Sequence, residues 1–246
     1  MHPKEFQMQL PKGIAYGNWD FLSPSLFNLR FEIDIRGNVD RQPGRYLQPY
    51  DACIAGIGCY FGLQTDVFKA GHGCQGHGLL FSRWKTRDLS DARFAPNGWI
   101  ESAGYEDDFV SVRALMPWST GRYLCSLAVV DDGGNGIWYE FIVMDHNTSQ
   151  TCSAGSLRFP AAQINSGGGT WTEVYSFAKN EEEVPETELR VISIAANDMT
   201  VRPTKCRVSY QDFSRSDAFV DNGTLVLRSG GNVVRKHEAQ HYNLEA

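Results

Sequence analysis

The sequence lacks a basic surplus, a long apolar run and an extended helical pattern. Lysine and arginine number 23 against 29 aspartate and glutamate residues, so the net charge is −6. Nucleic-acid-binding proteins usually carry a basic face, and we therefore expect no nucleic-acid partner. No run approaches the ~18 apolar residues of a membrane-spanning helix, so we also expect no membrane span. The signatures GxSxG, HExxH and the P-loop are absent too.

The first residues, MHPKEFQMQLPKG, lack the apolar core of a signal peptide. Two interpretations of the compartment stay open. The protein is cytoplasmic if Met1 is its native start, and it is extracellular or periplasmic if the chain is the mature form of an exported protein with an added methionine.

The six cysteines contain no CxxC pair and have no regular spacing. Alternation along 204–211 places Cys206 on one face with Val208 and Tyr210, and Cys125 shares a face with Leu127. These cysteines are typical of small buried apolar residues. We expect mostly reduced thiols.

Strict alternation of apolar and polar residues is the dominant pattern in the chain. It is clearest at 26–36, where one face is expected to enter a core: Phe27, Leu29, Phe31, Ile33 and Ile35. Residues 52–64 are apolar or small on both faces, which predicts one central strand with glycines that permit close backbone approach.

About eleven such segments are separated by glycine-rich turns, for example DDGGNG at 131–136. Only the acidic run 179–188 could form a helical turn, and we expect an exposed loop there. This pattern predicts a single-domain antiparallel β-sandwich or jelly roll with very little helix. Residues 1–25 would be an N-terminal extension and 232–246 a polar tail.

The segments YFGLQ (60–64) and LLFSRW (79–84) resemble the opening motif of a secreted bacterial family known as domain of unknown function 3472. Pro117-Trp118 followed by Gly121-Arg-Tyr123, and Thr170-Trp171 through Ser176-Phe177, resemble later segments of that family. The resemblance covers roughly residues 45–180. It implies a concanavalin-like sandwich associated with polysaccharide use and an exported setting, but no reaction.

A second resemblance concerns an enzyme. VFKAGHGCQ (67–75) is similar to the "Y-x-KAG-x-Y-x-Q" strand of jelly-roll alginate lyases, although the order of the segments along the chain is reversed. A lyase needs a base and a group that neutralises the uronate carboxylate. On this hypothesis, a lyase or hydrolase would use four residues: Lys69, His72, His77 and Arg190.

The loop 71–78 also suggests a metal site. Histidine and cysteine are good zinc ligands, and this loop contains His72, Cys74 and His77 among four glycines. Asp131, Asp132 and Asn135 offer oxygen ligands for calcium, although the turn itself explains them. Zinc and calcium are therefore secondary hypotheses, and we expect no cofactor.

Several strands carry aromatic and charged residues on one face, as Trp171, Glu173 and Tyr175 do. Such a face suits sugars, which offer C–H faces for stacking and hydroxyls for hydrogen bonds. The main hypothesis is a carbohydrate-binding module that recognises an oligo- or polysaccharide on a concave sheet face or adjoining loops. Its candidate ligand-binding residues are Gln64, Trp84, Arg113, Trp171, Glu173 and Tyr175, with Arg190 as a further polar reader. An enzyme on the same scaffold and a structural module without a small ligand are the alternatives.

Overall fold

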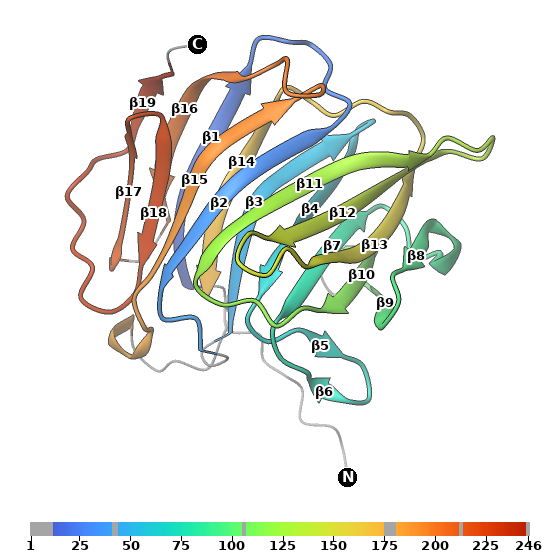
Figure 1. Ribbon diagram of the computed structural model, residues 1–246, viewed down its shortest axis with the longest axis horizontal. Coiled ribbons are helices and arrows are strands. Elements are labelled where there is room, and N and C mark those ends of the chain that lie inside the picture. Colours follow the sequence, from blue (N-terminus) through green and yellow to red (C-terminus); the bar gives the residue numbers. More distant parts are fainter. Residues whose placement is uncertain (1–11, 41–43, 105–106, 175–180, 212–213, 245–246) are drawn as a thin grey trace.

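The computed structural model describes residues 12–40, 44–104, 107–174, 181–211 and 214–244. Two large antiparallel sheets lie face to face (Figure 1). The first sheet has nine strands in the order β19 (Gln240–Asn243), β16 (Pro203–Tyr210), β1 (Lys12–Phe21), β14 (Gly167–Val174), β3 (Arg45–Ile54), β4 (Ile57–Gln64), β7 (Gly78–Trp84), β10 (Phe109–Leu115) and β9 (Gly98–Ala103).

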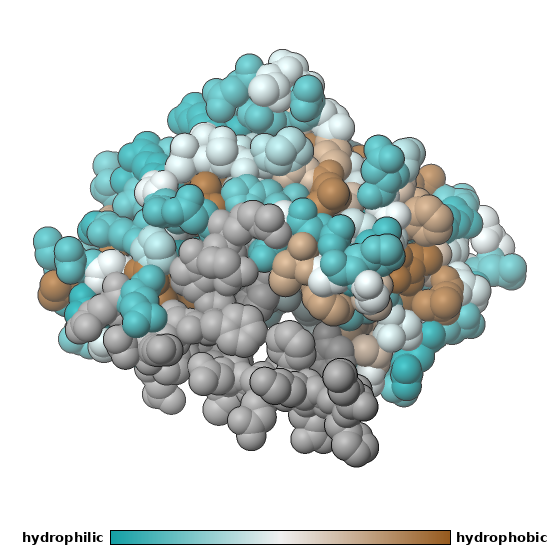
Figure 2. Space-filling view, turned by 90° about the horizontal axis from the view of Figure 1, so that it is seen from below, coloured by the Kyte–Doolittle hydropathy of each residue, from teal (hydrophilic) through white to brown (hydrophobic). Residues whose placement is uncertain are grey.

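The second sheet has eight strands in the order β17 (Ser216–Asp221), β18 (Thr224–Ser229), β15 (Thr187–Ala196), β2 (Leu29–Gly37), β11 (Gly121–Asp131), β12 (Ile137–Asp145), β13 (Thr151–Phe159) and β8 (Ala92–Phe94). A small hairpin of β5 (Phe68–Lys69) and β6 (Gly73–Cys74) projects from the nine-stranded sheet. Figure 1 shows it at the lower edge of the sandwich, and Figure 2 views the molecule from below. The helical content of the described residues is two 3₁₀ turns, η1 (Leu89–Asp91) and η2 (Glu181–Glu183). The expected β-sandwich is confirmed, and none of these helices is long and apolar enough to cross a membrane.

The core lies between the sheets and is filled by alternate residues of both. Leu29, Phe31, Ile33 and Ile35 of β2 are all buried, as their alternation predicts. Phe27 is an exception, because 52% of it is exposed. Strand β2 begins only at Leu29, and Leu26 takes the core position while it pairs with Ile164. The prediction that Phe27 faces the core is therefore wrong.

The region 52–64 forms a hairpin and not the single central strand predicted from its apolar pattern. Strands β3 and β4 pair with each other across the turn Ala55-Gly56, whose φ angles are +50° and +77°. Two successive residues with positive φ are the geometry of the tight turns that match strand twist. The apolar run concealed this turn because alanine at its first position is not a typical turn residue.

The two terminal segments also differ from expectation. Residues 12–21 of the expected N-terminal extension form β1, which pairs with β14 on one side and β16 on the other. In the expected polar tail, β19 pairs with β16 at the sheet edge. Strand β1 interrupts its apolar residues with glycine and asparagine, and β19 is polar apart from Tyr242, so alternation gave little strand signal in either, although neighbouring strands supply their hydrogen bonds.

All six cysteines lie in the described part of the chain, and each is a free thiol. Burial raises the pKa values of Cys59 and Cys125, and it raises the pKa of Cys206 to about 12. These thiols are therefore protonated and inert at neutral pH. Cys125 and Cys206 lie in the core, as the alternation predicts.

Candidate functional site: an aromatic belt on the nine-stranded sheet

Aromatic rings form a continuous belt across the outer face of the nine-stranded sheet. The four rings of the belt are Tyr16 of β1, Trp171 of β14, Tyr60 of β4 and Trp84 of β7. Successive ring centroids are 6.5, 6.3 and 5.0 Å apart. Tyr46 of β3 packs beside the belt, 6.5 Å from Trp171. All five rings are partly exposed, although the core lies just beneath them.

The strand register explains why these side chains share one face. Tyr16 lies opposite Trp171, while the alternate residues of β1, Ala15 and Trp19, are buried toward the other sheet. Because successive side chains of a strand point to opposite faces, every second residue of each strand lies on this outer face. A bulge in β3 between Leu47 and Tyr50 keeps both Tyr46 and Asp51 on the outer face, where their partners on β4 are Gln64 and Tyr60.

Polar side chains border the belt on both sides. On one side, Glu173 lies opposite Tyr46, and Tyr46 lies opposite Gln64. On the other side, Asn18 lies opposite Gly169, and Gly169 lies opposite Asp51. The Tyr16–Trp171 end of the belt thus lies between a Glu–Gln row and an Asn–Asp row, and Tyr60, opposite Asp51, continues the second row.

Two glycines bring polar groups close to the backbone beneath the belt. A Cβ on Gly169 would lie 2.9 Å from Oδ1 of Asp51 and 3.2 Å from Oδ1 of Asn18. A Cβ on Gly62 would lie 2.8 Å from Oε1 of Gln48. Gln48 is fully buried, and its amide has no hydrogen-bond partner within the described residues. Buried amides are nearly always paired, so Gln48 is an unusual feature of this face.

The carboxylates affect the titration of their neighbours. Burial, followed by the negative charges of Glu173 and Asp51, raises the pKa of Tyr16 to about 12. Partial desolvation by the surrounding sheet raises the pKa of the Asp51 carboxyl, although a hydrogen bond from the Gly169 amide at 2.5 Å opposes the shift. Perturbed groups of this kind are frequent at functional sites.

Beyond the belt, the same face carries a buried ionic group near the sheet edge. Nη2 of Arg113 lies 2.6 Å from the Glu101 carboxylate, and Nη1 donates to the Phe68 carbonyl at 3.2 Å. Trp99 donates to the same carbonyl. These bonds fix the β5–β6 hairpin against the sheet, so Arg113 has a structural role in this state.

Most of the sequence-predicted ligand-binding residues do meet on this face. Gln64, Trp84, Trp171 and Glu173 belong to the belt or its borders, and Arg113 lies on the same face but is already paired. Tyr175 lies outside the described residues. Arg190 lies on β15, in the other sheet, where it pairs with Glu188 and faces away from the core.

The four residues of the enzyme hypothesis are not gathered at one place. Lys69 lies over the Trp99 ring at 5.4 Å, and His72 is exposed in the β5–β6 turn. His77 stacks on Trp118, and its Nδ1 lies 2.6 Å from the Trp118 carbonyl oxygen. Arg190 belongs to the opposite sheet.

The zinc and calcium hypotheses gain no support. Within the described ranges, no three histidine, cysteine, aspartate or glutamate side chains are placed to hold a metal ion. His72 and Cys74 are exposed residues of the β5–β6 hairpin. Asp131 instead pairs with Arg93 at 2.7 Å and accepts from the Gly133 amide, and both contacts lower its pKa.

Sequence reasoning missed Tyr16, Tyr46, Gln48, Asp51 and Asn18. Tyr16 and Asn18 lie in the segment expected to be an N-terminal extension. Tyr46, Gln48 and Asp51 precede the turn Ala55-Gly56, which the sequence pattern did not reveal. One signal was present, because Gly58, Tyr60, Gly62 and Gln64 alternate along a single face of β4. That pattern combines an aromatic and an amide with two small residues.

The fold and this face define a β-sandwich protein with an aromatic-lined sheet surface. No protein-family model matches the chain, and neither does a curated protein. Solved structures with partial likeness include scytalido-glutamic peptidase with a peptide-based transition-state analog, at 10% identity and a TM-score of 0.46, over 88% of this chain and 98% of that one.

A second structure of scytalido-glutamic peptidase, with a transition-state analog inhibitor, gives 12% identity and a TM-score of 0.44, over 89% of this chain and 99% of that one. The structure of SCP-B, a member of the eqolisin peptidase family in complex with the tripeptide Ala-Ile-His, is similar at 9% identity and a TM-score of 0.39. The match covers 89% of this chain and 98% of that one. Likeness at this level carries no argument about function.

Proposed function

We propose that the aromatic belt binds an oligosaccharide across the outer face of the nine-stranded sheet. The observation that carries this proposal is the run of four partly exposed rings, Tyr16, Trp171, Tyr60 and Trp84, with polar side chains beside it. Rings stack on the C–H faces of sugars, and the amides and carboxylates beside them accept hydrogen bonds from hydroxyls. Four strand spacings separate β1 from β7, on the order of 19 Å, which suits several sugar rings in a row.

The charge of the face narrows the class of sugar. Glu173 and Asp51 border the belt, while Arg113 is neutralised by Glu101. Like charges brought together disfavour binding, so a uronate would be repelled by the two carboxylates. The proposed ligand is therefore a neutral glycan or one that carries amino sugars.

The test is a glycan array followed by calorimetric titration with the best ligand. Trp171→Ala removes the ring that contacts Tyr16, Tyr46 and Tyr60, and it should weaken binding at least tenfold, or by about 1.4 kcal/mol. The matched control is Trp99→Ala, because Trp99 is a partly exposed ring on the same sheet but outside the belt. Equal affinity of the two variants, or no glycan binding by the wild type, refutes the proposal.

Hydrolysis on the same face is the second candidate function. The raised pKa of Asp51 favours it, because a carboxyl whose pKa lies above its usual range is better matched to general acid–base chemistry near neutral pH. Product analysis of the bound glycan, with a denatured protein as a second substrate, separates binding from cleavage. Cleavage that is lost in Asp51→Asn while binding persists would assign an enzyme.

A further inference from the structure

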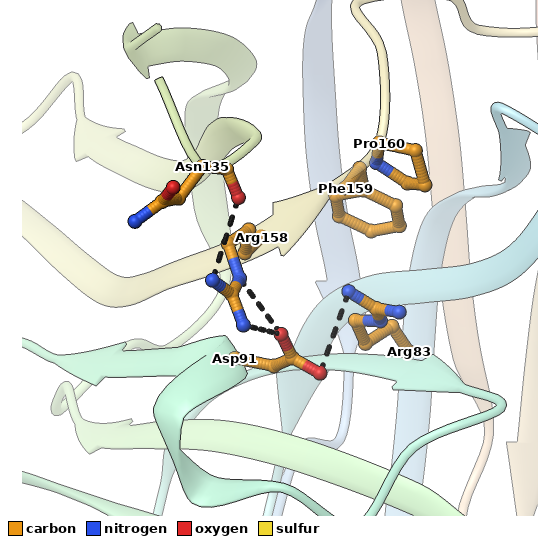
Figure 3. A pocket seen from close by; sticks show the side chains of 6 residues that line it. All are labelled: Arg83, Asp91, Asn135, Arg158, Phe159 and Pro160. Carbon is orange, nitrogen blue, oxygen red and sulfur yellow. Dashed lines mark hydrogen bonds and ion pairs between the residues drawn. The ribbon is translucent and has the colours of Figure 1, made fainter. Parts of the chain in front are cut away.

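A separate cleft opens at one end of the sandwich, where strands of both sheets meet the η1 turn and the β11–β12 loop. Its volume is about 270 Å³, and its lining residues are Arg83, Asp91, Asn135, Arg158, Phe159 and Pro160. Figure 3 shows the two guanidinium groups on either side of the Asp91 carboxylate, with Phe159 and Pro160 nearby. None of these residues belongs to the aromatic belt, so the inference does not depend on the proposed glycan site.

Arg83 is the unusual residue of this cleft. Alternation along β7 places it on the core-facing side with Leu79 and Phe81, and only 6% of it is exposed. Within the described residues it makes no hydrogen bond, and its Nε is buried without a partner. The nearest carboxylate oxygen, on Asp91, is 3.9 Å from Nη1, which is too long for a hydrogen bond.

Asp91 is committed to other partners. Its Oδ1 lies 2.6 and 2.8 Å from two nitrogens of Arg158, and its Oδ2 accepts from the Thr86 hydroxyl at 2.6 Å. The cleft therefore holds two guanidinium groups and one carboxylate, a surplus of one positive charge. The Cζ atom of Arg83 lies 5.0 Å from the centre of the Phe159 ring. This contact helps to orient the guanidinium group, but the ring supplies no negative charge.

A buried cation without hydrogen bonds is costly, and proteins normally pair such groups. Desolvation lowers the pKa of Arg83, and the nearby Arg158 acts in the same direction, against the opposing effect of Asp91. The planar fork of an arginine matches the oxygens of a carboxylate or a phosphate. A small oxyanion in the cleft would supply both the missing charge and the missing acceptors.

We propose that this cleft is a binding site for a small oxyanion, a carboxylate or phosphate group, held by Arg83 with the support of Arg158. The site lies at the ends of β7 and β13, on the core-facing side of β7, whereas the neighbouring Trp84 of the belt lies on the outer face. Its apolar wall of Phe159 and Pro160 would contact the carbon portion of a carboxylate ligand.

The experiment is calorimetric titration of the whole protein with inorganic phosphate and, separately, with acetate, at constant pH and ionic strength in chloride. We expect saturable binding at one site for at least one of the two anions. Phosphate alone would identify the phosphate class and acetate alone the carboxylate class, and binding of both would indicate a general oxyanion site. Absence of saturable binding for both anions overturns the proposal.

Two matched variants test whether the binding belongs to the cleft. Arg83→Met removes the guanidinium that makes no hydrogen bond but keeps an unbranched apolar stem, and it should weaken binding at least tenfold. Arg93→Met is the control, because Arg93 pairs with Asp131 over the Trp138 ring and does not line the cleft. Equal affinity in both variants contradicts the assignment.

The melting temperature gives an independent measurement. A ligand that binds only the folded state raises it, so phosphate or acetate should stabilise the wild type and Arg93→Met but not Arg83→Met. If Arg83→Met does not fold, Arg158→Met tests the same cleft, because it removes the other cation. Stabilisation that persists in the variant lacking one of these cations also overturns the proposal.

Discussion

Gly62 and Gly58 offer a paired test of how closely strands β3 and β4 approach beneath the aromatic belt. Both glycines lie on the outer face of β4, and neither has a positive φ, so alanine is compatible with the backbone at each. Their surroundings differ. A Cβ on Gly62 would lie 2.4 Å from the Leu47 carbonyl oxygen and 3.0 Å from Cα of Gln48, whereas a Cβ on Gly58 would meet only the Trp84 ring, at 3.6 Å.

The magnitudes follow from these contacts. Gly62→Ala forces backbone atoms apart in the middle of the sheet, and such overpacking costs about 1–3 kcal/mol. Gly58→Ala makes an ordinary contact and reduces the entropy of the unfolded chain, which should stabilise the fold by about 0.4–1 kcal/mol. For a domain of this size, 1 kcal/mol corresponds to roughly 2–4 °C in melting temperature.

Differential scanning calorimetry of the two variants beside the wild type measures the difference, and urea unfolding checks it. We expect the melting temperature to fall for Gly62→Ala and to stay level or rise for Gly58→Ala. Because Gly62 also leaves room for Gln48, we expect Gly62→Ala to weaken glycan binding as well. A Gly62→Ala variant as stable as Gly58→Ala would refute the tight approach of the two strands.

Two further predictions concern stability. Burial is the main cause that raises the pKa values of Tyr16 and Tyr139 from 10.0 to about 12, so the stability that depends on their neutral form is complete below pH 10 and is lost as the pH rises toward 12. Urea unfolding across this range, with tyrosinate absorbance as the titration readout, checks it, and constant stability would contradict it. The buried Asp217 carboxylate accepts from the Lys236 and His237 amides at 3.0 Å each, so Asp217→Ala should cost about 2–3 kcal/mol and expose β19 to hydrogen exchange. Unchanged protection of β19 would show that the segment is held by its pairing with β16 alone.

The sequence predicted those features that depend on alternation within one segment. Leu29 to Ile35, Cys125 and Cys206 lie in the core because period-2 patterning fixes the face of a strand once the strand exists. The same rule placed Trp171 and Glu173 together on one face of β14. No such rule states which strands become neighbours, and Tyr16 of β1 lies opposite Trp171 of β14, which is far away along the chain.

The belt therefore could not be assembled from the sequence, although its members alternate correctly. Trp171 meets Tyr60 only because β3 lies between their strands, and Trp84 meets Tyr60 only because β7 follows β4 in the sheet. A single misassigned turn, Ala55-Gly56, was enough to hide Tyr46 and Asp51.

The cleft, too, could not be assembled from the sequence, although one of its residues stands out in the sequence. The pattern LLFSRW places Arg83 on the face of Leu79 and Phe81, and a charged residue at a core-facing position is a signal that sequence alone contains. The meaning of that signal depends on Asp91, which comes from a 3₁₀ turn, and on Arg158, which comes from the other sheet. Only when Asp91 is seen to be held by Arg158 does Arg83 become a cation without a hydrogen bond, and the inference of an anion site rests on that arrangement.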